Sequence, residues 1–361
     1  MAIAQKTYKV IGLMSGTSLD GLDIIYCHFK KNIDTWDFSI EKTESIDYTS
    51  HFKEKLKKTV HLEASKLIAY HNQYGTWLGE QVKNFINTNK VKVDFVSSHG
   101  HTVFHQPQIG LTYQIGSGQH LANACKQKVI CDFRTNDVAL GGQGAPLVPI
   151  GDQLLFGDYD FCLNLGGISN ISFNHQEERV AYDISPANML LNYICKKINL
   201  EYDEGGKLAA SGSINTQLLD QLDKLAYYKL PYPKSLGFEW FRDIVIPIIE
   251  DIDDSVINLL HTSAYHIATQ IANAIKNIKK KNPSVLITGG GAKNNFLIKV
   301  LKQKLDNQVS VVIPSIEIID FKEALIFGFM GVLRDQNEIN CLQSVTGATK
   351  DSSSGVIYKP S

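Results

Sequence analysis

The sequence predicts an α/β protein whose two halves contain the same order of elements. The chain has 361 residues, and at roughly 150 residues per domain this length predicts two domains. Each half contains a short apolar strand that ends in a Gly- and Ser-rich turn and resumes as a second strand. A third glycine run, residues 289–291, follows a strand of buried type and precedes a helix start. We therefore expect two α/β domains whose glycine-rich turns serve a shared ligand.

The first glycine-rich hairpin lies near the N-terminus. Residues 8–13 form an apolar strand, residues 15–21 read SGTSLDG, and residues 24–29 return as a second strand. Glycine admits positive φ and lets backbone N–H groups approach a ligand closely. A plain hairpin turn is the ordinary interpretation of one such segment. Its recurrence in the second half favours a pair of phosphate cradles.

The second hairpin is followed by a candidate base. Residues 161–165 are apolar, Gly166 and Gly167 form the turn, and residues 171–173 resume the strand. The carboxylate of Asp183 comes shortly afterwards. A phosphate cradle and a group able to accept a proton are therefore expected close together in this half.

The rest of the chain alternates strands and helices. Residues 61–88 carry apolar side chains at helical spacing, which predicts a core-facing helix. Residues 91–97 and 129–132 read as short buried strands, and residues 251–280 as one or two long helices. The closing segment, residues 344–359, is a Gly- and Ser-rich turn with a short strand, which we expect to pack on the first domain.

Composition and charge restrict the class of partner. The net charge is −1, and the basic run at residues 279–281 is of the kind that ends a helix, so nucleic acid is not an expected partner. The six cysteines lack CxxC spacing and stand mostly inside apolar runs, which favours a reducing cytoplasm. The apolar run at residues 324–333 is too short to span a bilayer, and the N-terminus lacks a signal-peptide core. We expect a soluble, cytoplasmic protein with no membrane partner.

Three histidines gather at residues 98–105. Alternate residues on an extended segment share a face, so two imidazoles could hold a metal ion. No acidic residue or cysteine lies within the segment, and polar residues that follow a buried strand often contact substrate in α/β proteins. We favour hydrogen bonding to a substrate, with a plain surface loop as the alternative.

A second polar segment follows at residues 132–149. Arg134 and Asp137 could form a local ion pair, or could bind an acid-bearing sugar, and their spacing does not decide between the two. The run GGQGAPLVP at residues 141–149 has the composition of a hinge or ligand loop, so we place the domain boundary near it. The first domain would comprise residues 1–135 and about 340–361, and the second residues 136–339.

Several nucleotide-binding signatures are missing from the sequence. Residues 116–118 fail the GxGxxG dinucleotide pattern because Leu121 occupies its last position. A P-loop motif and the HRD and DFG motifs of protein kinases are also lacking. The remaining architecture is that of actin-like sugar kinases. We thus predict duplicated ribonuclease H-like domains of the actin, hexokinase and Hsp70 type, with a nucleotide and sugar cleft between them.

Eight motifs span the whole chain. In order they are GLMSGTSLDGLD (12–23), SHGHTVFH (98–105), DFRTNDVALGGQGAPLVP (132–149), NLGGISN (164–170), DISPAN (183–188), DEGG (203–206), ITGGGAKN (287–294) and KEA (322–324). In this arrangement the sequence resembles the 1,6-anhydro-N-acetylmuramic acid kinases of bacterial cell-wall recycling. The resemblance implies that ATP phosphorylates O6 of the anhydro sugar while water opens the anhydro bridge, giving N-acetylmuramate 6-phosphate and ADP. It also implies a homodimer.

The resemblance assigns roles to individual residues. Asp183 would be the base that activates water, and Asp20 would orient Mg²⁺ or its waters. The implied phosphate-binding residues are Gly12, Ser15, Gly16, Thr17, Ser18, Asp20, Gly166, Gly167 and Ser169. The implied nucleoside-facing residues are Gly289, Gly290, Gly291 and Asn294. The implied sugar-binding residues are His99, Arg134, Asp137, Gly144, Ala145, Pro146, Asn188 and Glu323, followed by His101 and Lys322.

Three positions depart from the family pattern. The family commonly has Thr and Gly where this chain has Ile184 and Ser185, and Gln where it has His101. These departures leave other functions open. The alternatives are an actin-like kinase for a non-anhydro amino sugar, a non-catalytic sugar or nucleotide sensor, and, ranked last, an ATP-independent glycosidase, which would need a second carboxylic acid.

Overall fold

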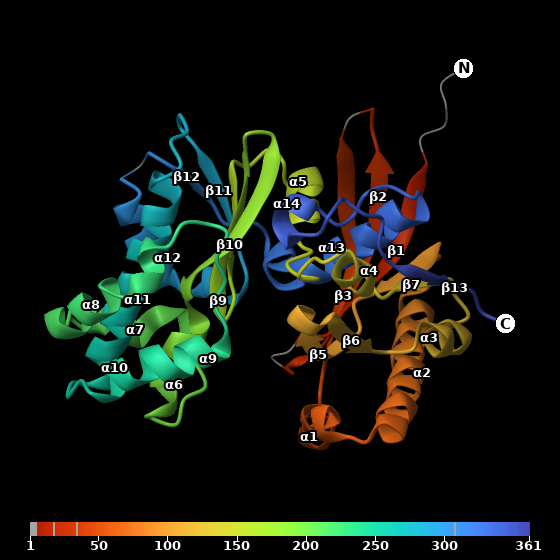
Figure 1. Cartoon of the computed structure of the whole chain (residues 1–361), viewed down its shortest axis with the longest axis horizontal. Helices are drawn as coiled ribbons and strands as arrows, with labels where there is room; N and C mark the ends of the chain where they lie inside the picture. Colours follow the sequence, from red (N-terminus) through yellow and green to blue (C-terminus); the bar gives the residue numbers. More distant parts are fainter. Residues whose placement is uncertain (1–5, 17–18, 34, 307) are drawn as a thin grey trace. The chain divides into compact units, whose positions relative to one another are not determined.

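The computed structural model describes residues 6–16, 19–33, 35–306 and 308–361 (Figure 1). The chain divides into two compact units. Unit 1 comprises Met1–Phe156 and Phe321–Ser361, and unit 2 comprises Gly157–Asp320. These limits differ from the predicted boundaries near residues 135 and 340. The reason is packing, because Phe156 contacts Phe38 of the first sheet and Gly328 lies against Gly12 of its central strand.

The core of unit 1 is a six-stranded sheet in the order β13-β7-β4-β1-β2-β3. Its strands are β1 (Thr7–Met14), β2 (Gly21–Lys31), β3 (Trp36–Asp47), β4 (Phe95–Ser98), β7 (Val129–Cys131) and β13 (Val356–Tyr358). Strands β1, β2 and β3 pair antiparallel, whereas β4 joins β1 and β7 in parallel. β13 pairs with β7, which confirms that the C-terminal segment packs on the first domain.

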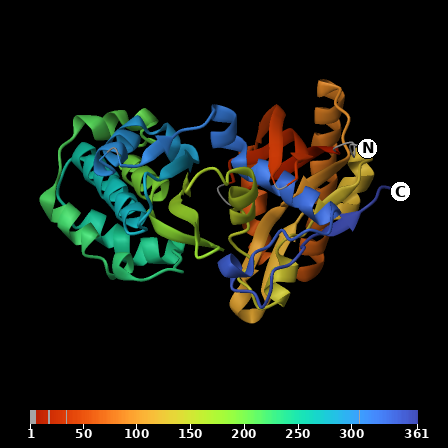
Figure 2. The ribbon, with the colours of Figure 1, turned by 90° about the horizontal axis from the view of Figure 1, so that it is seen from above.

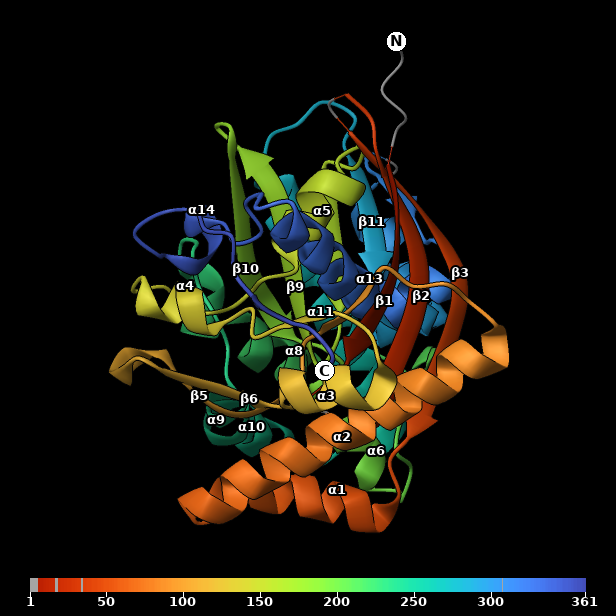
Figure 3. The ribbon, with the colours of Figure 1, turned by 90° about the vertical axis from the view of Figure 1, so that its right-hand side faces the viewer.

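Helices cover both faces of this sheet. They are α1 (Ser50–Lys57), α2 (Ala64–Asn89), α3 (Gly118–Cys125), α4 (Thr135–Ala139), α5 (Pro149–Leu155), α13 (Ile316–Asp335) and α14 (Gln343–Thr346). Ile11 and Leu13 point to the face packed by α2, which lies beside α3 (Figure 3). Gly12 points to the opposite face, along which α13 runs (Figure 2). The predicted apolar stripe on α2 is confirmed at Leu67, Tyr74, Leu78, Val82 and Phe85, whereas Ile68, whose position in the sequence also fits the stripe, is exposed.

The histidine-rich segment is a strand rather than a loop. It forms β5 (His101–Gln106), which pairs antiparallel with β6 (Leu111–Ile115) in a separate two-stranded sheet. The turn between them contains a short 3₁₀ helix, η2 (Pro107–Ile109). His99 and His101 are buried, so this segment is not a plain surface loop.

Unit 2 repeats the strand order of unit 1. Its sheet runs β10-β9-β8-β11-β12, with β8 (Phe161–Leu165), β9 (Ile168–His175), β10 (Glu178–Pro186), β11 (Ser284–Thr288) and β12 (Ser310–Val312). The first three strands are antiparallel, and β11 joins β8 and β12 in parallel. This is the arrangement of β1, β2, β3, β4 and β7. The predicted duplication of a ribonuclease H-like fold is therefore confirmed.

Helices also surround the apolar core of unit 2. They are α6 (Asn188–Lys196), α7 (Lys207–Ser211), α8 (Thr216–Asp223), α9 (Phe238–Trp240), α10 (Ile246–Glu250), α11 (Val256–Lys276) and α12 (Asn295–Lys304). Short turns are η3 (Glu204–Gly206), η4 (Ala226–Lys229), the π-helical η5 (Phe241–Val245) and η6 (Gly290–Lys293). Alternate residues of β8, such as Leu163 and Leu165, pack with α11 in this core.

The six cysteines are all free and buried, as the sequence predicts. Burial raises the pKa of several of these thiols, with that of Cys125 at about 11 and that of Cys131 at about 12. Among the described residues, none of the helices combines the length and apolar character that a membrane-spanning helix requires.

Candidate active site

The glycine-rich turn of unit 1 begins at the end of β1. Gly12 lies inside this strand and is buried, and a Cβ atom there would overlap the carbonyl oxygen of Ala324 on α13. Packing alone therefore requires glycine at this position. Gly16 is half-buried, and its carbonyl accepts a hydrogen bond from the Leu19 N–H (3.3 Å). Thr17 and Ser18, also predicted to bind phosphate, lie outside the described residues.

Ser15 belongs to a buried chain of hydrogen bonds. Its Oγ accepts from Tyr48 Oη (2.8 Å) and lies 3.2 Å from His101 Nδ1. Tyr74 Oη must donate to Tyr48 Oη (2.8 Å), because the Tyr48 proton is already used. Ser15 Oγ and His101 Nδ1 form the last pair of this chain of hydrogen bonds. Desolvation lowers the pKa of His101 to about 4, which keeps this ring neutral.

His99 and Arg134 contact each other directly. Arg134 donates from Nε and Nη2 to His99 Nε2 (3.0 and 2.9 Å) and from Nη1 to the Gly144 carbonyl (2.6 Å). His99 donates from Nδ1 to the Gly100 carbonyl (2.9 Å). Desolvation and the guanidinium hold the pKa of His99 well below its usual value. Because both ring nitrogens are engaged, His99 orients Arg134, whose remaining N–H groups can reach a ligand.

Asp137 holds the glycine-rich loop of unit 1. Its carboxylate accepts from the Gly144 N–H (2.7 Å) and from the Thr346 hydroxyl (2.7 Å), and the residue is 1% exposed. These contacts explain the conformation of the loop, in which Gly144 has φ +66°. Ala145 is half-buried and Pro146 is exposed, so a ligand can reach this part of the loop more readily than Asp137.

The KEA motif places two charged side chains on α13 within unit 1. Lys322 Nζ lies 2.6 Å from Asp152 Oδ1 of α5, and both side chains are 6% exposed. Glu323 is exposed, and its charge stabilises the guanidinium of Arg134, opposing the desolvation that lowers the Arg134 pKa to about 10. Lys322 is thus a structural cation, whereas Glu323 is open to a ligand.

The glycine-rich turn of unit 2 is tied to the start of α6. The Gly166 carbonyl accepts from the Asn188 N–H (3.1 Å), and the Gly167 carbonyl accepts from Ala187 and Met189 (2.8 and 3.0 Å). Gly167 is exposed, and a Cβ atom there would meet Met189 Cε only at 3.7 Å. Gly290 is likewise exposed, with Asn188 Nδ2 3.6 Å from an added Cβ. The fold itself therefore leaves room for a side chain at both positions.

Ser169 pairs with Ser185, one of the residues that depart from the family pattern. Ser169 Oγ donates to the Ser185 carbonyl (2.9 Å) and accepts from the Ser185 N–H (3.2 Å), and both serines are fully buried. Ser169 was predicted to bind phosphate, but its hydroxyl is occupied by this backbone pairing. Ile184 points into the apolar core. The Asp183 carboxylate accepts from Leu236 rather than from Ile184 or Ser185.

Asp183 lies near the end of β10, opposite Asn170 of β9. Its carboxylate Oδ2 accepts from the Leu236 N–H (2.9 Å), and Oδ1 accepts no hydrogen bond from the described residues. Desolvation raises the pKa of this carboxyl above its usual range, and the Leu236 bond partly opposes the shift. A partly buried carboxylate with one unengaged oxygen is suited to accepting a proton from a bound molecule.

The third glycine run meets two other motifs within unit 2. Gly289 has φ +80°, and an added Cβ would lie 2.5 Å from Asn164 Oδ1. Asn294 caps α12 by accepting from the Leu297 N–H (3.0 Å), and a Cβ on Gly206 of the DEGG motif would overlap its side chain. Asn188 donates to the Leu165 carbonyl (3.0 Å). Gly291 and Asn294 are buried, whereas Gly290 is exposed.

Asp20 is an exposed carboxylate, and its backbone carbonyl accepts from the Tyr48 N–H (3.2 Å). Within residues 6–16, 19–33, 35–306 and 308–361, no three His, Cys, Asp or Glu side chains converge as a metal site would require. One carboxylate still fits Mg²⁺, which commonly binds nucleotide phosphates and water with few protein ligands.

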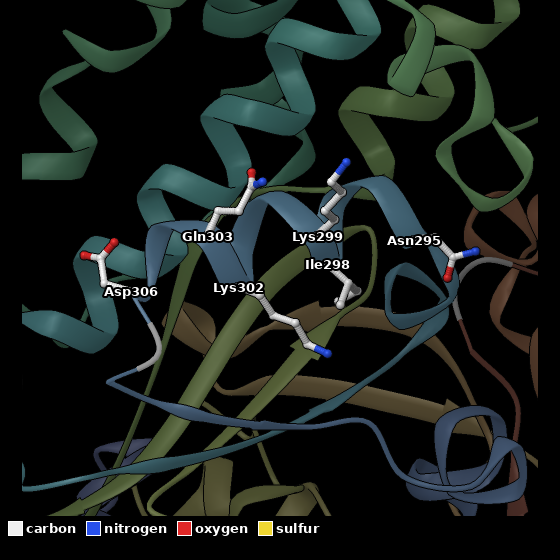
Figure 4. A pocket seen from close by; sticks show the side chains of 6 residues that line it. All are labelled: Asn295, Ile298, Lys299, Lys302, Gln303 and Asp306. Atoms are coloured by element: carbon white, nitrogen blue, oxygen red, sulfur yellow. The ribbon is translucent and has the colours of Figure 1, made fainter.

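A shallow pocket of about 670 Å³ lies along α12 (Figure 4). It is lined by Asn295, Ile298, Lys299, Lys302, Gln303 and Asp306. Its lining includes none of the predicted site residues. We therefore do not assign it to the active site.

The segment that holds Asp183 has no local signal in the sequence. Residues 227–238 are rich in Tyr, Pro and Lys and look like a surface excursion in the sequence. In the structure, Tyr227 and Leu236 of this segment are buried and bond directly to Asp183. No local pattern could have revealed this, because the contact joins residues about 50 positions apart.

Comparison with known proteins places the whole chain in one family. A family model described as anhydro-N-acetylmuramic acid kinase matches residues 8–360. Proteins of that name from Hydrogenovibrio crunogenus and Haemophilus influenzae are each 33% identical to it. The alignments cover 97% of this chain and 98% of the first relative, and 99% of both chains for the second. The relative from Francisella tularensis subsp. novicida is also 33% identical, over 94% of this chain and 95% of its own. The chain therefore belongs to the anhydro-N-acetylmuramic acid kinase family.

Proposed function

We propose that this chain is a cytoplasmic, ATP-dependent kinase of peptidoglycan recycling. It would open the anhydro ring of 1,6-anhydro-N-acetylmuramic acid with water and phosphorylate O6, giving N-acetylmuramate 6-phosphate and ADP. The observation that carries the proposal is the environment of Asp183, which has a raised pKa and one unengaged carboxylate oxygen. Family membership supplies the substrate class.

Asp183 would act as the general base for ring opening. Its carboxylate would take a proton from water as the water oxygen bonds to C1 of the sugar, and the C1–O6 bond would break. The negative charge that develops on O6 would be taken up by bonding to the γ-phosphorus of ATP, with ADP as the leaving group. Inverting glycosidases use a carboxylate in the same way, but with a carboxylic acid at the leaving oxygen. Here phosphoryl transfer replaces that acid.

Glycine-rich turns would hold the phosphates. Gly167 and Gly290 are exposed and have room for a side chain, so the fold gives no steric reason for glycine there. A close approach of phosphate oxygens to the backbone would provide a reason for glycine at both positions. Asp20 would bind Mg²⁺ directly or through water, and the bound ion would neutralise charge on the transferred phosphoryl group.

Arg134 and Glu323 would contact the sugar from unit 1. Arg134 is held by His99 and Gly144, and the guanidinium is suited to a carboxylate such as that of a muramic acid. His99 and Asp137 would act by orienting Arg134 and the loop around Gly144. Ala145, Pro146 and Asn188 remain proposed sugar contacts, and a homodimer remains a proposal from the family resemblance.

The proposal is tested by ADP release and product mass with MgATP and three sugars. The sugars are 1,6-anhydro-N-acetylmuramic acid, N-acetylmuramic acid and N-acetylglucosamine. We expect turnover only of the anhydro sugar, with a product heavier by one HPO₃ and one water. Preference for a non-anhydro sugar would retain the kinase and remove the ring-opening step. Binding of sugar or ATP without turnover would favour a sensor.

The Gly167→Ala variant distinguishes two possible reasons for glycine at this position, namely contact with a ligand and a requirement of the fold. Because an added Cβ would meet Met189 only at 3.7 Å, we expect the urea midpoint of unfolding to stay unchanged. If a phosphate approaches this backbone, the methyl group should raise the KM for ATP by about tenfold, since small displacements weaken positioning. An unchanged KM for ATP would remove Gly167 from the proposed phosphate cradle.

A further inference from the structure

One segment of unit 2, residues 227–236, forms hydrogen bonds with three atoms of Asp183. Tyr227 Oη donates to the Asp183 carbonyl (2.6 Å), and the Asp183 N–H donates to the Lys234 carbonyl (3.1 Å). The Leu236 N–H donates to the carboxylate itself (2.9 Å). The contacts lie beside the register shift between Asp183 and Ser185 in β10. Residues 227–236 therefore set both the backbone and the carboxylate of this residue.

The same segment is anchored to α11 by a hydrogen-bonded network whose central residue, His266, is buried. Tyr228 Oη lies 2.9 Å from His266 Nε2, and His266 Nδ1 lies 2.6 Å from Asp223 Oδ1. Gln270 Nε2 also donates to Asp223 Oδ1 (2.9 Å). An ionised Asp223 only accepts, so His266 donates to it from Nδ1. Burial would raise the pKa of Asp223, but the bond and charge of His266 bring it below its usual value.

Tyr227 and Tyr228 are adjacent on η4 and have partners on different elements. One reaches Asp183 on β10, and the other reaches His266 on α11. Lys234 links the two ends of the segment. Its Nζ donates to the Tyr227 carbonyl (3.1 Å) and lies 4.6 Å from the centre of the Tyr227 ring. Fixing Tyr228 therefore fixes the backbone from which Tyr227 extends.

We propose that Asp223, His266 and Tyr228 form a positioning network for Asp183. The network, which we call the Asp223 anchor, holds η4 and thereby maintains the three hydrogen bonds to the base. This inference rests on the proposed function for the role of Asp183 as base. The anchor residues touch neither substrate nor nucleotide in the proposed site, and they act only through residues 227–236.

The anchor should influence the basicity of Asp183. The Leu236 bond stabilises the ionised carboxylate and opposes desolvation. If η4 loosens, this bond weakens and the pKa of Asp183 should rise further, since loss of a donor disfavours the charged form. Titratable groups beside the contact are Tyr182, Tyr227 and Lys234, and all three side chains are retained when only Tyr228 is changed.

Tyr228→Phe tests the anchor with a minimal change. It removes the hydroxyl that bonds to His266 and keeps the ring. We expect kcat to fall about tenfold, with the KM for sugar and ATP unchanged, and the acid limb of the kcat profile to move up by about half a pH unit. Tyr232→Phe is the matched control, because its ring stacks on Tyr182 (5.3 Å) and its hydroxyl makes no hydrogen bond with the described residues. The control should behave as wild type.

Carbon-13 titration of the Asp183 carboxyl gives a readout without turnover. The resonance would be assigned from its loss in Asp183→Asn, and its pKa should be higher in Tyr228→Phe than in wild type or Tyr232→Phe. That result would support the anchor even if no sugar is phosphorylated, so the two proposals fail separately. The anchor is overturned if the carboxyl pKa does not move, or if Tyr232→Phe shifts it equally.

Discussion

Replacing Asp183 with asparagine is expected to lower sugar-dependent ADP formation by about 10³-fold, because the amide cannot take a proton from the attacking water. Asparagine keeps the shape of the side chain and an oxygen that can accept from the Leu236 N–H. The KM values for ATP and sugar, or their binding constants where turnover is too slow, should therefore remain close to those of wild type. The measurement is ADP release with each substrate varied.

A surface carboxylate of the same unit provides the control for this variant. Asp243 is exposed and pairs with Arg242, so Asp243→Asn should retain full activity. Retention of ring opening by Asp183→Asn at more than about a tenth of the wild-type rate would argue against a proton-accepting role, since general-base catalysis usually contributes more than this.

The same carboxylate is expected to oppose folding at neutral pH. Burial raises the pKa of Asp183 in the folded state, so the folded protein binds this proton more tightly than the unfolded chain. The contribution of the protonated Asp183 carboxyl to the free energy of unfolding is complete below its pKa in the unfolded chain. This contribution is lost as pH rises through its pKa in the folded protein. At neutral pH, Asp183→Asn should therefore have a higher urea midpoint of unfolding than wild type. In acid, the difference between the two midpoints should be smaller.

Gly12→Ala is expected to have the largest effect on stability, a loss of about 3 kcal/mol in unit 1. Its Cβ atom would overlap the Ala324 carbonyl oxygen and lie 3.1 Å from the Gly328 nitrogen, and neither backbone atom can rotate away. Strand β1 and helix α13 would have to separate. Trp36 reports this interface, because its ring lies 5.1 Å from Phe329 of α13. The measurement is urea unfolding followed by tryptophan fluorescence.

Gly290→Ala makes the same chemical change where the structure has space. The added Cβ would lie 3.6 Å from Asn188 Nδ2, so stability should change by less than about 0.5 kcal/mol. Equal unfolding midpoints for the two variants would show that β1 and α13 are less closely packed than the structure indicates.

The sequence predicted the repeated fold well because its signals are local. Short apolar strands that flank glycine-rich turns identified both hairpins, and β1, β2, β8 and β9 occur where expected. The roles of the glycines were less predictable. Gly12 and Gly167 resemble each other in sequence, but a helix about 300 residues away makes glycine obligatory only at the first. That contact has no local signature.

Individual site residues show the same limit. Ser169 and Asp137 are polar side chains in ligand-type loops, which is why the sequence favours them as contacts. In the structure, Ser185 occupies the hydroxyl of the first, and Thr346 and the Gly144 N–H occupy the carboxylate of the second. These hydrogen bonds join residues that are 16 and 209 positions apart in the sequence, and they determine which polar groups remain open to a ligand.

The buried cysteines make the natural chain suitable for site-specific labelling. All six thiols lie in the described part of the chain and are shielded from solvent, and burial keeps several of them protonated at neutral pH. Thiolate is the reactive form, so maleimide reagents should leave the native protein unmodified. One cysteine introduced on the surface of each unit would then carry a donor and an acceptor dye without prior removal of native thiols. Energy transfer between the dyes would report how the separation of the two units responds to ATP and sugar.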